Sequence, residues 1–303
     1  YTDSSHLSPT PFGDAGYGIT CQSGLSISFW MKVTASHADD RVVISRWVSQ
    51  AGVDYLKYCD WRVYVGGNTP PTANTDKVVF EVVDHNAGPA QIRQCVQDSL
   101  LNNVVDGDWH NVVVVLDSDD GAPGDECNWM QSVYIDGDNK LATTTTTDNL
   151  RIDPTDTTPK FILAAQYDDT SLYENYFAFG EGHIDEVSIW IDEAQSLSSG
   201  QIEIIHNGTK GDPDGCPTDL HLGIGTPPTL TSWWRMGDTF GDDPSSIGEI
   251  QDVQLNYNIS PYAKYDSTFD FEVPSPCSYA ATFYGFTASL DFVGLNTYIN
   301  DPI

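Results

Sequence analysis

The sequence DGDWHNVVVVLDSDDGAPGDECNWMQSVYIDG, residues 106–137, decides which fold the rest of the chain can adopt. Its first apolar run, VVVVL at residues 112–116, contains four β-branched valines that are stiff at χ1, which favours a strand over a helix. An acidic, glycine-containing loop follows. A second apolar run, residues 133–135, ends in Asp136-Gly137, a tight hairpin signal. The stretch therefore predicts a strand, a loop and a strand, with the first strand buried on both faces.

Two further motifs flank this hairpin. GLSISFWM precedes it at residues 24–31, and GHIDEVSIW follows it at residues 182–190. Together with WHNVVVVLD and VYIDG, and in this order, they resemble laminin-G-like domains, which are members of the concanavalin A-like jelly-roll superfamily. The resemblance extends over residues 18–208 and implies an all-β jelly-roll sandwich. It leaves the function open, because this fold hosts lectins, adhesion modules, structural proteins and glycosidases.

The remaining segments are mostly short apolar runs separated by turns, which is typical of a β-sandwich. Apolar residues alternate along residues 25–33, as expected for a strand with one face in the core. Further strands are expected at residues 41–48, 55–65, 77–83, 161–166 and 177–179. Residues 91–103 fit either a strand or a short helix. Residues 143–147, all threonine, suit a strand or O-linked sugar.

One helix is predicted, within residues 196–207, with a serine cap and Gly208 as its stop. We divide the chain into an N-terminal arm (residues 1–17), one jelly roll (18–272) and a C-terminal extension (273–303). The jelly roll includes a Pro/Gly-rich connector at 209–229 and a strand at 230–238.

Two segments stand at an unexpected place in the chain. LTSWWRMGD (230–238) and SLDFVGLNTYI (289–299) resemble the strands that open a laminin-G-like unit, yet here they follow the rest of the domain. Similar WWRMGD strings occur in phage virion and other microbial surface proteins that carry such units. Because a sandwich without an opening strand exposes unpaired backbone groups, residues 289–299 are expected to fill the gap.

The second segment has four possible arrangements: closure on its own domain, donation to the next copy, a cut through a tandem array, or a tail packed outside. We favour donation, because the Pro-flanked stretch 273–277 offers a way out of the core and a head-to-tail contact builds a fibre. The donated side chains would be Leu290, Phe292, Leu295, Tyr298 and Ile299. The leading functional hypothesis is therefore a non-enzymatic structural subunit of an extracellular filament or virion surface, with copies of itself as partners.

Composition limits the partners and the compartment. The 303 residues include 44 acidic and 13 basic ones, a formal net charge of −31. Phosphate backbones repel such a surface, so nucleic-acid binding is disfavoured, and an extracellular setting or cation binding fits better. There is no signal peptide and no run that could span a membrane, so the numbered chain is expected to start after processing or within a longer protein.

The cysteines are scattered, without a C-x-x-C pair, which disfavours a zinc site. Their even number in an acidic β-rich chain predicts at least two disulfides, with buried free thiols as the alternative. The six positions are Cys21, Cys59, Cys95, Cys127, Cys216 and Cys277.

Calcium is the cofactor that the acidic loops favour, since it prefers six to eight hard oxygen ligands. The candidate ligands are Asp117, Asp119, Asp120 and Asp125, together with Glu126. A second acidic pair stands at residues 168–169. Solvated loop acids are the alternative interpretation.

Carbohydrate contact is the basis of the alternative function, a calcium-dependent lectin or adhesion module. Aromatic rings stack on sugar faces, and the candidates are Trp61, Tyr64 and Trp129. The chain also carries two glycosylation sequons, at Asn207 and Asn258.

Catalysis is not expected. Retaining glycosidases need two carboxylates roughly 5–5.5 Å apart, and the nearest match is the segment from Glu181 to Glu186. Asp185 and Glu186 are adjacent, so a regular strand would point them to opposite faces, and no second glutamate follows at the right spacing. No G-x-S-x-G elbow occurs either.

The histidines have structural interpretations as well. His110 follows Trp109 in the W-H pair of the resembled family, which implies a hydrogen-bonded or core histidine rather than a base. His183 and His206 are expected to serve similar structural roles.

Overall fold

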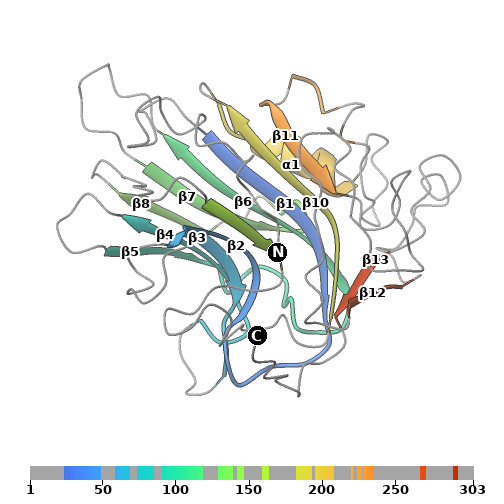
Figure 1. Cartoon of the computed structure of the whole chain (residues 1–303). Coiled ribbons are helices and arrows are strands. Elements are labelled where there is room, and N and C mark those ends of the chain that lie inside the picture. Colours follow the sequence, from blue (N-terminus) through green and yellow to red (C-terminus); the bar gives the residue numbers. More distant parts are fainter. Residues whose placement is uncertain are drawn as a thin grey trace, which may run out of the picture.

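A computed structural model of the chain shows a β-sandwich of two antiparallel sheets, with one short helix among the residues that it describes (Figure 1). It describes residues 24–48, 59–68, 74–84, 91–118, 129–138, 142–146, 159–163, 182–192, 195–207, 220, 224–226, 228–234, 267–270 and 289–292. The predicted all-β jelly-roll architecture is confirmed.

The larger sheet has eight strands in the order β12-β13-β10-β1-β6-β7-β8, with β11 also paired to β10. The strands are β1 (Gly24–Val33), β6 (Trp109–Ser118), β7 (Trp129–Ile135), β8 (Ala142–Thr146), β10 (Gly182–Asp192), β11 (Leu230–Trp234), β12 (Ser267–Asp270) and β13 (Ser289–Phe292). The threonine run thus forms strand β8.

The smaller sheet has five strands in the order β5-β4-β3-β2-β9. They are β2 (Arg41–Val48), β3 (Cys59–Val65), β4 (Val78–Asp84), β5 (Gln91–Val96) and β9 (Pro159–Leu163). The segment 91–103, which fitted either a strand or a helix, therefore forms a strand over its first six residues, β5, and no helix over the rest. The strand expected at residues 177–179 lies outside the described residues.

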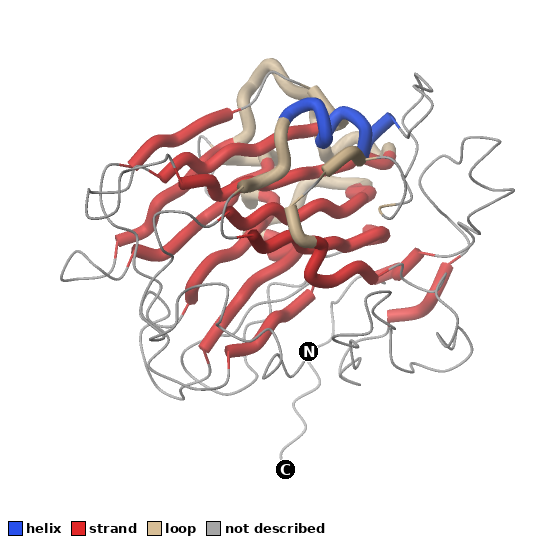
Figure 2. The backbone as a smooth tube through the Cα atoms, turned by 90° about the horizontal axis from the view of Figure 1, so that it is seen from above, coloured by secondary structure: helices blue, strands red, loops and turns tan. Residues whose placement is uncertain are grey.

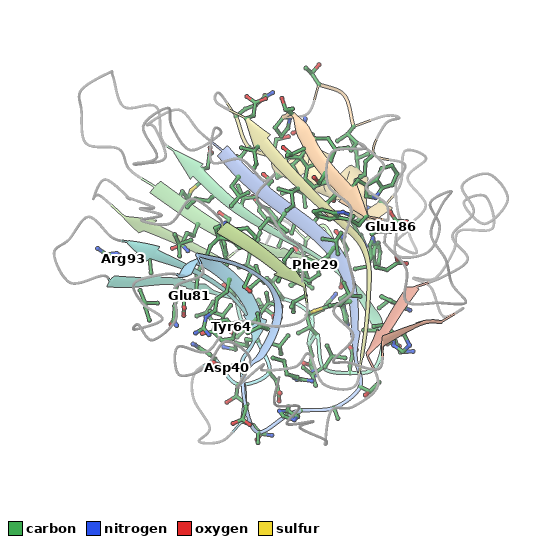
Figure 3. The ribbon with its side chains drawn as sticks, in the orientation of Figure 1. Phe29, Asp40, Tyr64, Glu81, Arg93 and Glu186 are labelled. Carbon is green, nitrogen blue, oxygen red and sulfur yellow. The ribbon has the colours of Figure 1, made fainter. Side chains whose placement is uncertain are left out.

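The main core lies between the two sheets and follows the two-residue period of the strands. On β1 it contains Leu25, Ile27, Phe29, Met31 and Val33, each at most 2% exposed, as the alternation predicted. Burying a side chain of this size contributes about 1.5–3 kcal/mol. Figure 3 shows Phe29 at the centre of this layer.

A second apolar cluster lies on the outer face of the larger sheet, beneath helix α1 (Ser199–Asn207). Ile202 and Ile205 of α1 are buried together with Val113 and Val115 of β6. The run VVVVL is therefore buried on both faces, as predicted. Figure 2 shows helix α1 lying across the outside of the strands.

The helix begins with a reciprocal cap. Ser198 Oγ accepts a hydrogen bond from Gln201 N at 3.4 Å, and Ser198 N donates to Gln201 Oε1 at 2.8 Å. This capping box satisfies backbone donors that the first turn of a helix leaves without partners. It is the serine cap that the sequence predicted. Among the described residues, no helix is long and apolar enough to cross a membrane.

Both displaced opening strands pair with the outer edge of β10. Residues 230–234 of β11 lie beside Val187–Trp190, and Leu290 and Phe292 of β13 lie opposite Ile184 and Gly182. β10 is 11 residues long, so its edge can pair with two short strands end to end.

The prediction of strand donation is therefore wrong for Leu290 and Phe292, because their own domain provides the pairing edge. Leu295, Tyr298 and Ile299 lie outside the described residues.

Candidate functional site

A buried polar network lies on the outer face of the five-stranded sheet. Arg62 Nε donates to Glu81 Oε1 at 2.8 Å, and Arg62 Nη2 donates to Glu81 Oε2 at 3.2 Å. Gln94 Nε2 donates to Glu81 Oε2 at 2.9 Å and to Tyr64 Oη at 3.1 Å. Glu81 is completely buried. These groups satisfy one another, so the network fastens strands β3, β4 and β5 together (Figure 3).

Two of the predicted sugar-stacking residues belong to this sheet and are buried. Trp61 is 2% exposed and lies in the core between the sheets. Tyr64 is 3% exposed, and the guanidinium carbon of Arg62 lies 4.5 Å from the centre of its ring. Burial, followed by the charge of Glu81, raises the pKa of Tyr64. Neither ring presents a face to solvent, so the prediction of stacking by Trp61 and Tyr64 is corrected. Trp61 stands two residues before Val63 on β3, so the two side chains point to the same face of the strand, which is the core face.

His110 is held between two carboxylates at one end of the sandwich. Its Nδ1 lies 2.8 Å from Asp136 Oδ2, and its Nε2 lies 3.0 Å from Asp106 Oδ1. Burial works against the charged form, but the hydrogen bonds and charges of Asp136 and Asp106 raise the pKa of His110 to about 9. The imidazole is a cation at neutral pH. It is a hydrogen-bonded histidine, as predicted, and is poorly suited to act as a base.

The acids Asp185 and Glu186 lie on the same face of the sheet, because β10 contains a bulge at Glu186. Glu186 has φ of 50°, and the register with β1 shifts between Ser28 and Trp30. Asp185 lies opposite Trp30, while Glu186 Oε2 accepts a hydrogen bond from Trp233 Nε1 at 2.6 Å. A bulge breaks the strict alternation of a strand.

The expectation of opposite faces is therefore corrected. Both carboxylates are buried on the helix-covered face, Asp185 at 0% and Glu186 at 5% exposure. The segment expected to be a poor match to a glycosidase pair thus buries both acids in the outer face of the larger sheet instead of presenting them to solvent.

A row of half-exposed side chains crosses the outer face of the larger sheet beyond the end of α1. Lys32 of β1 lies opposite Trp109 of β6 on one side and opposite His183 of β10 on the other. The ring centres of Trp109 and His183 are 5.8 Å apart, with planes tilted by 56°. All three residues are neither fully buried nor fully exposed. We call these three residues the Trp109 row.

The Trp109 row combines an aromatic ring with polar groups on a solvent-accessible face. Trp109 Nε1 is buried and has no hydrogen-bond partner within the described part of the chain. An indole ring offers an apolar face to the C–H side of a sugar. In the sequence, Trp109 and His183 belong to motifs with structural interpretations, and Lys32 directly follows the motif GLSISFWM without being part of it. Strand parity places each residue on its face, but only the register of β6, β1 and β10 brings the three together.

The other predicted site residues are divided between described and undescribed segments. Asp117 is half-buried near the end of β6, while Asp119, Asp120 and Asp125 lie outside the described residues. Within the ranges that the structure describes, no group of three or more His, Cys, Asp or Glu side chains could hold a metal ion. The calcium site stays a prediction.

The remaining predictions are also open. Trp129 begins β7, but its side chain is not among those described, and Asn258 is outside the described ranges. Asn207 is the half-buried last residue of α1. Cys95 is buried in the core, and the disulfide prediction is not tested by it.

Comparison with known proteins gives one family match. A family model for the concanavalin A-like lectin/glucanases superfamily matches residues 11–203. No curated protein matches the chain significantly.

Several solved structures match part of the chain at low identity and low TM-score. The receptor-binding domain of botulinum neurotoxin type G is 15% identical, with a TM-score of 0.29, over 59% of this chain and 36% of that one. The enzymatically active domain of tailspike protein 2 from bacteriophage CBA120 is 11% identical, with a TM-score of 0.35, over 61% and 24%. The binding domain of botulinum neurotoxin DC in complex with SialylT is 16% identical, with a TM-score of 0.33, over 60% and 35%. The chain spans about a third or less of the length of these structures, and the likeness concerns the fold alone.

Proposed function

Because the chain belongs to the concanavalin A-like lectin/glucanase superfamily, we propose that it is a non-catalytic carbohydrate-binding module whose contact surface is the Trp109 row. The partial exposure of Trp109 is the observation that carries the proposal. The rings of Trp61 and Tyr64 are buried, whereas Trp109 lies beyond the end of the covering helix. A sugar ring stacked there would have the side chains of Lys32 and His183 beside it.

Burial of the acids supports binding over hydrolysis. General acid and nucleophile must reach the scissile bond, yet Asp185 and Glu186 are at most 5% exposed and Glu186 is held by Trp233. His110 is occupied by its two carboxylate partners. The proposed module therefore binds carbohydrate without hydrolysing it.

The proposal also includes an extracellular or surface-displayed setting and a calcium cofactor. A net charge of −31 suits an extracellular or surface-displayed protein. Calcium bound by the loop that begins at Asp117 would position neighbouring loops and neutralise part of that charge. Polymerisation by strand donation is not included, because β13 pairs with its own domain.

The test is binding to a glycan array, with and without calcium, by the wild type and by Trp109→Ala. We expect the wild type to bind at least one glycan and Trp109→Ala to lose about tenfold or more of the affinity, since an aromatic contact is worth on the order of 1 kcal/mol or more beyond its buried area. Met130→Ala is the matched control, because Met130 is 39% exposed on β7 of the same sheet and lies outside the row.

A second variant keeps the proposal testable if Trp109→Ala does not fold. Lys32→Ala removes a half-exposed side chain of the row and should also weaken binding. The proposal fails if the wild type binds no glycan in either condition, or if folded Trp109→Ala and Lys32→Ala both bind as the wild type does.

A further inference from the structure

The C-terminal end of α1 is held against the larger sheet by the imidazole ring of His206. His206 stacks on Trp30 of β1, with ring centres 5.5 Å apart and planes inclined by 23°. It also packs on the hairpin turn after β7, where a Cβ added to Gly137 would lie 3.1 Å from His206 Cβ. Gly137 has φ of 65°, a conformation that favours glycine. The close approach of the helix to the turn therefore depends on both residues.

The docked position has no acceptor ready for a second imidazole proton. His206 Nδ1 is buried and has no hydrogen-bond partner among the residues described. The carboxylate of Asp136, which faces it, is already engaged: Oδ2 by His110 at 2.8 Å and Asn102 Nδ2 at 2.7 Å, and Oδ1 by Asn111 N at 3.0 Å. A buried N–H without an acceptor costs about 1–3 kcal/mol.

The charges around His206 come from three elements. β6 contributes the His110 cation, with Asp106 on its far side, and the turn after β7 contributes Asp136. Its own helix contributes Glu203 and a C-terminal dipole that attracts cations, while β1 contributes the neutral Trp30. Burial lowers the pKa of His206; Asp136 opposes this and His110 adds to it, and the net direction is downward.

We propose that this contact is an acid-sensitive latch: protonation of His206 releases the end of α1 from Trp30 and Gly137, while the sandwich beneath stays folded. The partners of the latch keep their charge over the same range, because the pKa of His110 is raised to about 9 and those of Asp106 and Asp136 are lowered. The ordinary pKa of His206, about 6.5, lies between about pH 5 and pH 7.5, whereas the pKa of His110 lies above this range and those of the two aspartates lie below it.

Release would enlarge the surface beside the Trp109 row. Trp30 stands two residues before Lys32 on the same face of β1, so an undocked helix end uncovers a second indole next to the first. If the proposed function holds, the latch couples sugar binding to pH. The latch itself does not depend on that function.

Amide hydrogen exchange of residues 202–207 tests the latch without any ligand. Protection factors, which remove the intrinsic pH dependence of exchange, are measured at about pH 7.5 and about pH 5. An imidazole with an ordinary pKa near 6.5 that binds its proton only when undocked lowers protection by up to about 30-fold at the lower pH. Amides of β1 and β6 should keep their protection.

His206→Phe keeps a ring on Trp30 but cannot be protonated, so α1 should stay equally protected at both pH values. His206→Gln, which lacks the ring, should lower protection at both and remove the pH dependence. His37→Gln, on an exposed histidine far along the chain from α1, should behave like the wild type. Equal protection of wild-type α1 at the two pH values, or an undiminished acid effect in His206→Phe and His206→Gln, would overturn the latch. Failure on the glycan array would leave these results untouched.

Discussion

The polar network on the five-stranded sheet allows a direct stability prediction for Glu81→Gln. Glu81 is completely buried and accepts two hydrogen bonds from Arg62 and one from Gln94. Glutamine preserves the volume but removes the counter-charge, leaving the guanidinium of Arg62, a residue that is 8% exposed, without its ion-pair partner. Breaking a buried pair in this way costs about 3–5 kcal/mol, and the residual exposure of Arg62 favours the lower end, about 3 kcal/mol.

Urea unfolding followed by tryptophan fluorescence measures this cost. For an m-value of about 3 kcal/mol/M, the midpoint should fall by about 1 M with the slope unchanged. The double variant Arg62→Met with Glu81→Leu replaces both charges by apolar groups and should be far less destabilised than the sum of the two single variants, because no unpaired charge remains.

Gln94→Ala is the matched control for this network. The Gln94 side chain is exposed and contributes one amide, so its loss should cost only about 1 kcal/mol. A cost below about 1 kcal/mol for Glu81→Gln, or additive single effects in the double variant, would refute the view that Glu81 chiefly neutralises a buried guanidinium.

Three further predictions concern pH, backbone space and metal. The free energy of unfolding should fall by about 2 kcal/mol, after allowance for solvent screening, as the pH rises from 6.5 towards 9, because the raised folded-state pKa of His110 stabilises the fold fully only below the unfolded pKa. His110→Gln should lose this pH dependence. A wild-type urea midpoint that stays constant over this pH range would contradict the prediction. Gly67→Ala should lower the melting temperature by several degrees, since its Cβ would lie 2.5 Å from Ala38 O. The Cβ of Gly200→Ala in α1 would have nothing within 4 Å, so this variant should be neutral or stabilising. Similar melting temperatures for the two variants would refute the steric argument. If the loop that begins at Asp117 binds calcium, millimolar calcium should raise the melting temperature of chelator-stripped protein, and no shift would return these acids to solvated loop residues.

Local patterns predicted the elements well where the signal is short-range. The alternation of residues 25–33, the valine run after His110 and the serine cap of α1 each depend on neighbours within a few positions, and each is found as expected. The ambiguous segment 91–103 required the sheet, because its strand is stabilised by pairing with β4, a partner from earlier in the chain.

The sequence by itself determined the strands, the helix and its cap, and the sandwich class, because side-chain periodicity and capping are local properties of the chain. Only the tertiary structure decided which edge the late strand β13 joins, since the free edge of β10 is created by distant pairing. The same holds for the two acids that the bulge at Glu186 brings to one face, and for the burial of Tyr64 under Arg62. The Trp109 row exists only through the register of three strands whose residues are up to 151 positions apart, as between Lys32 and His183. Register is a property of paired strands, so no single stretch of sequence contains it.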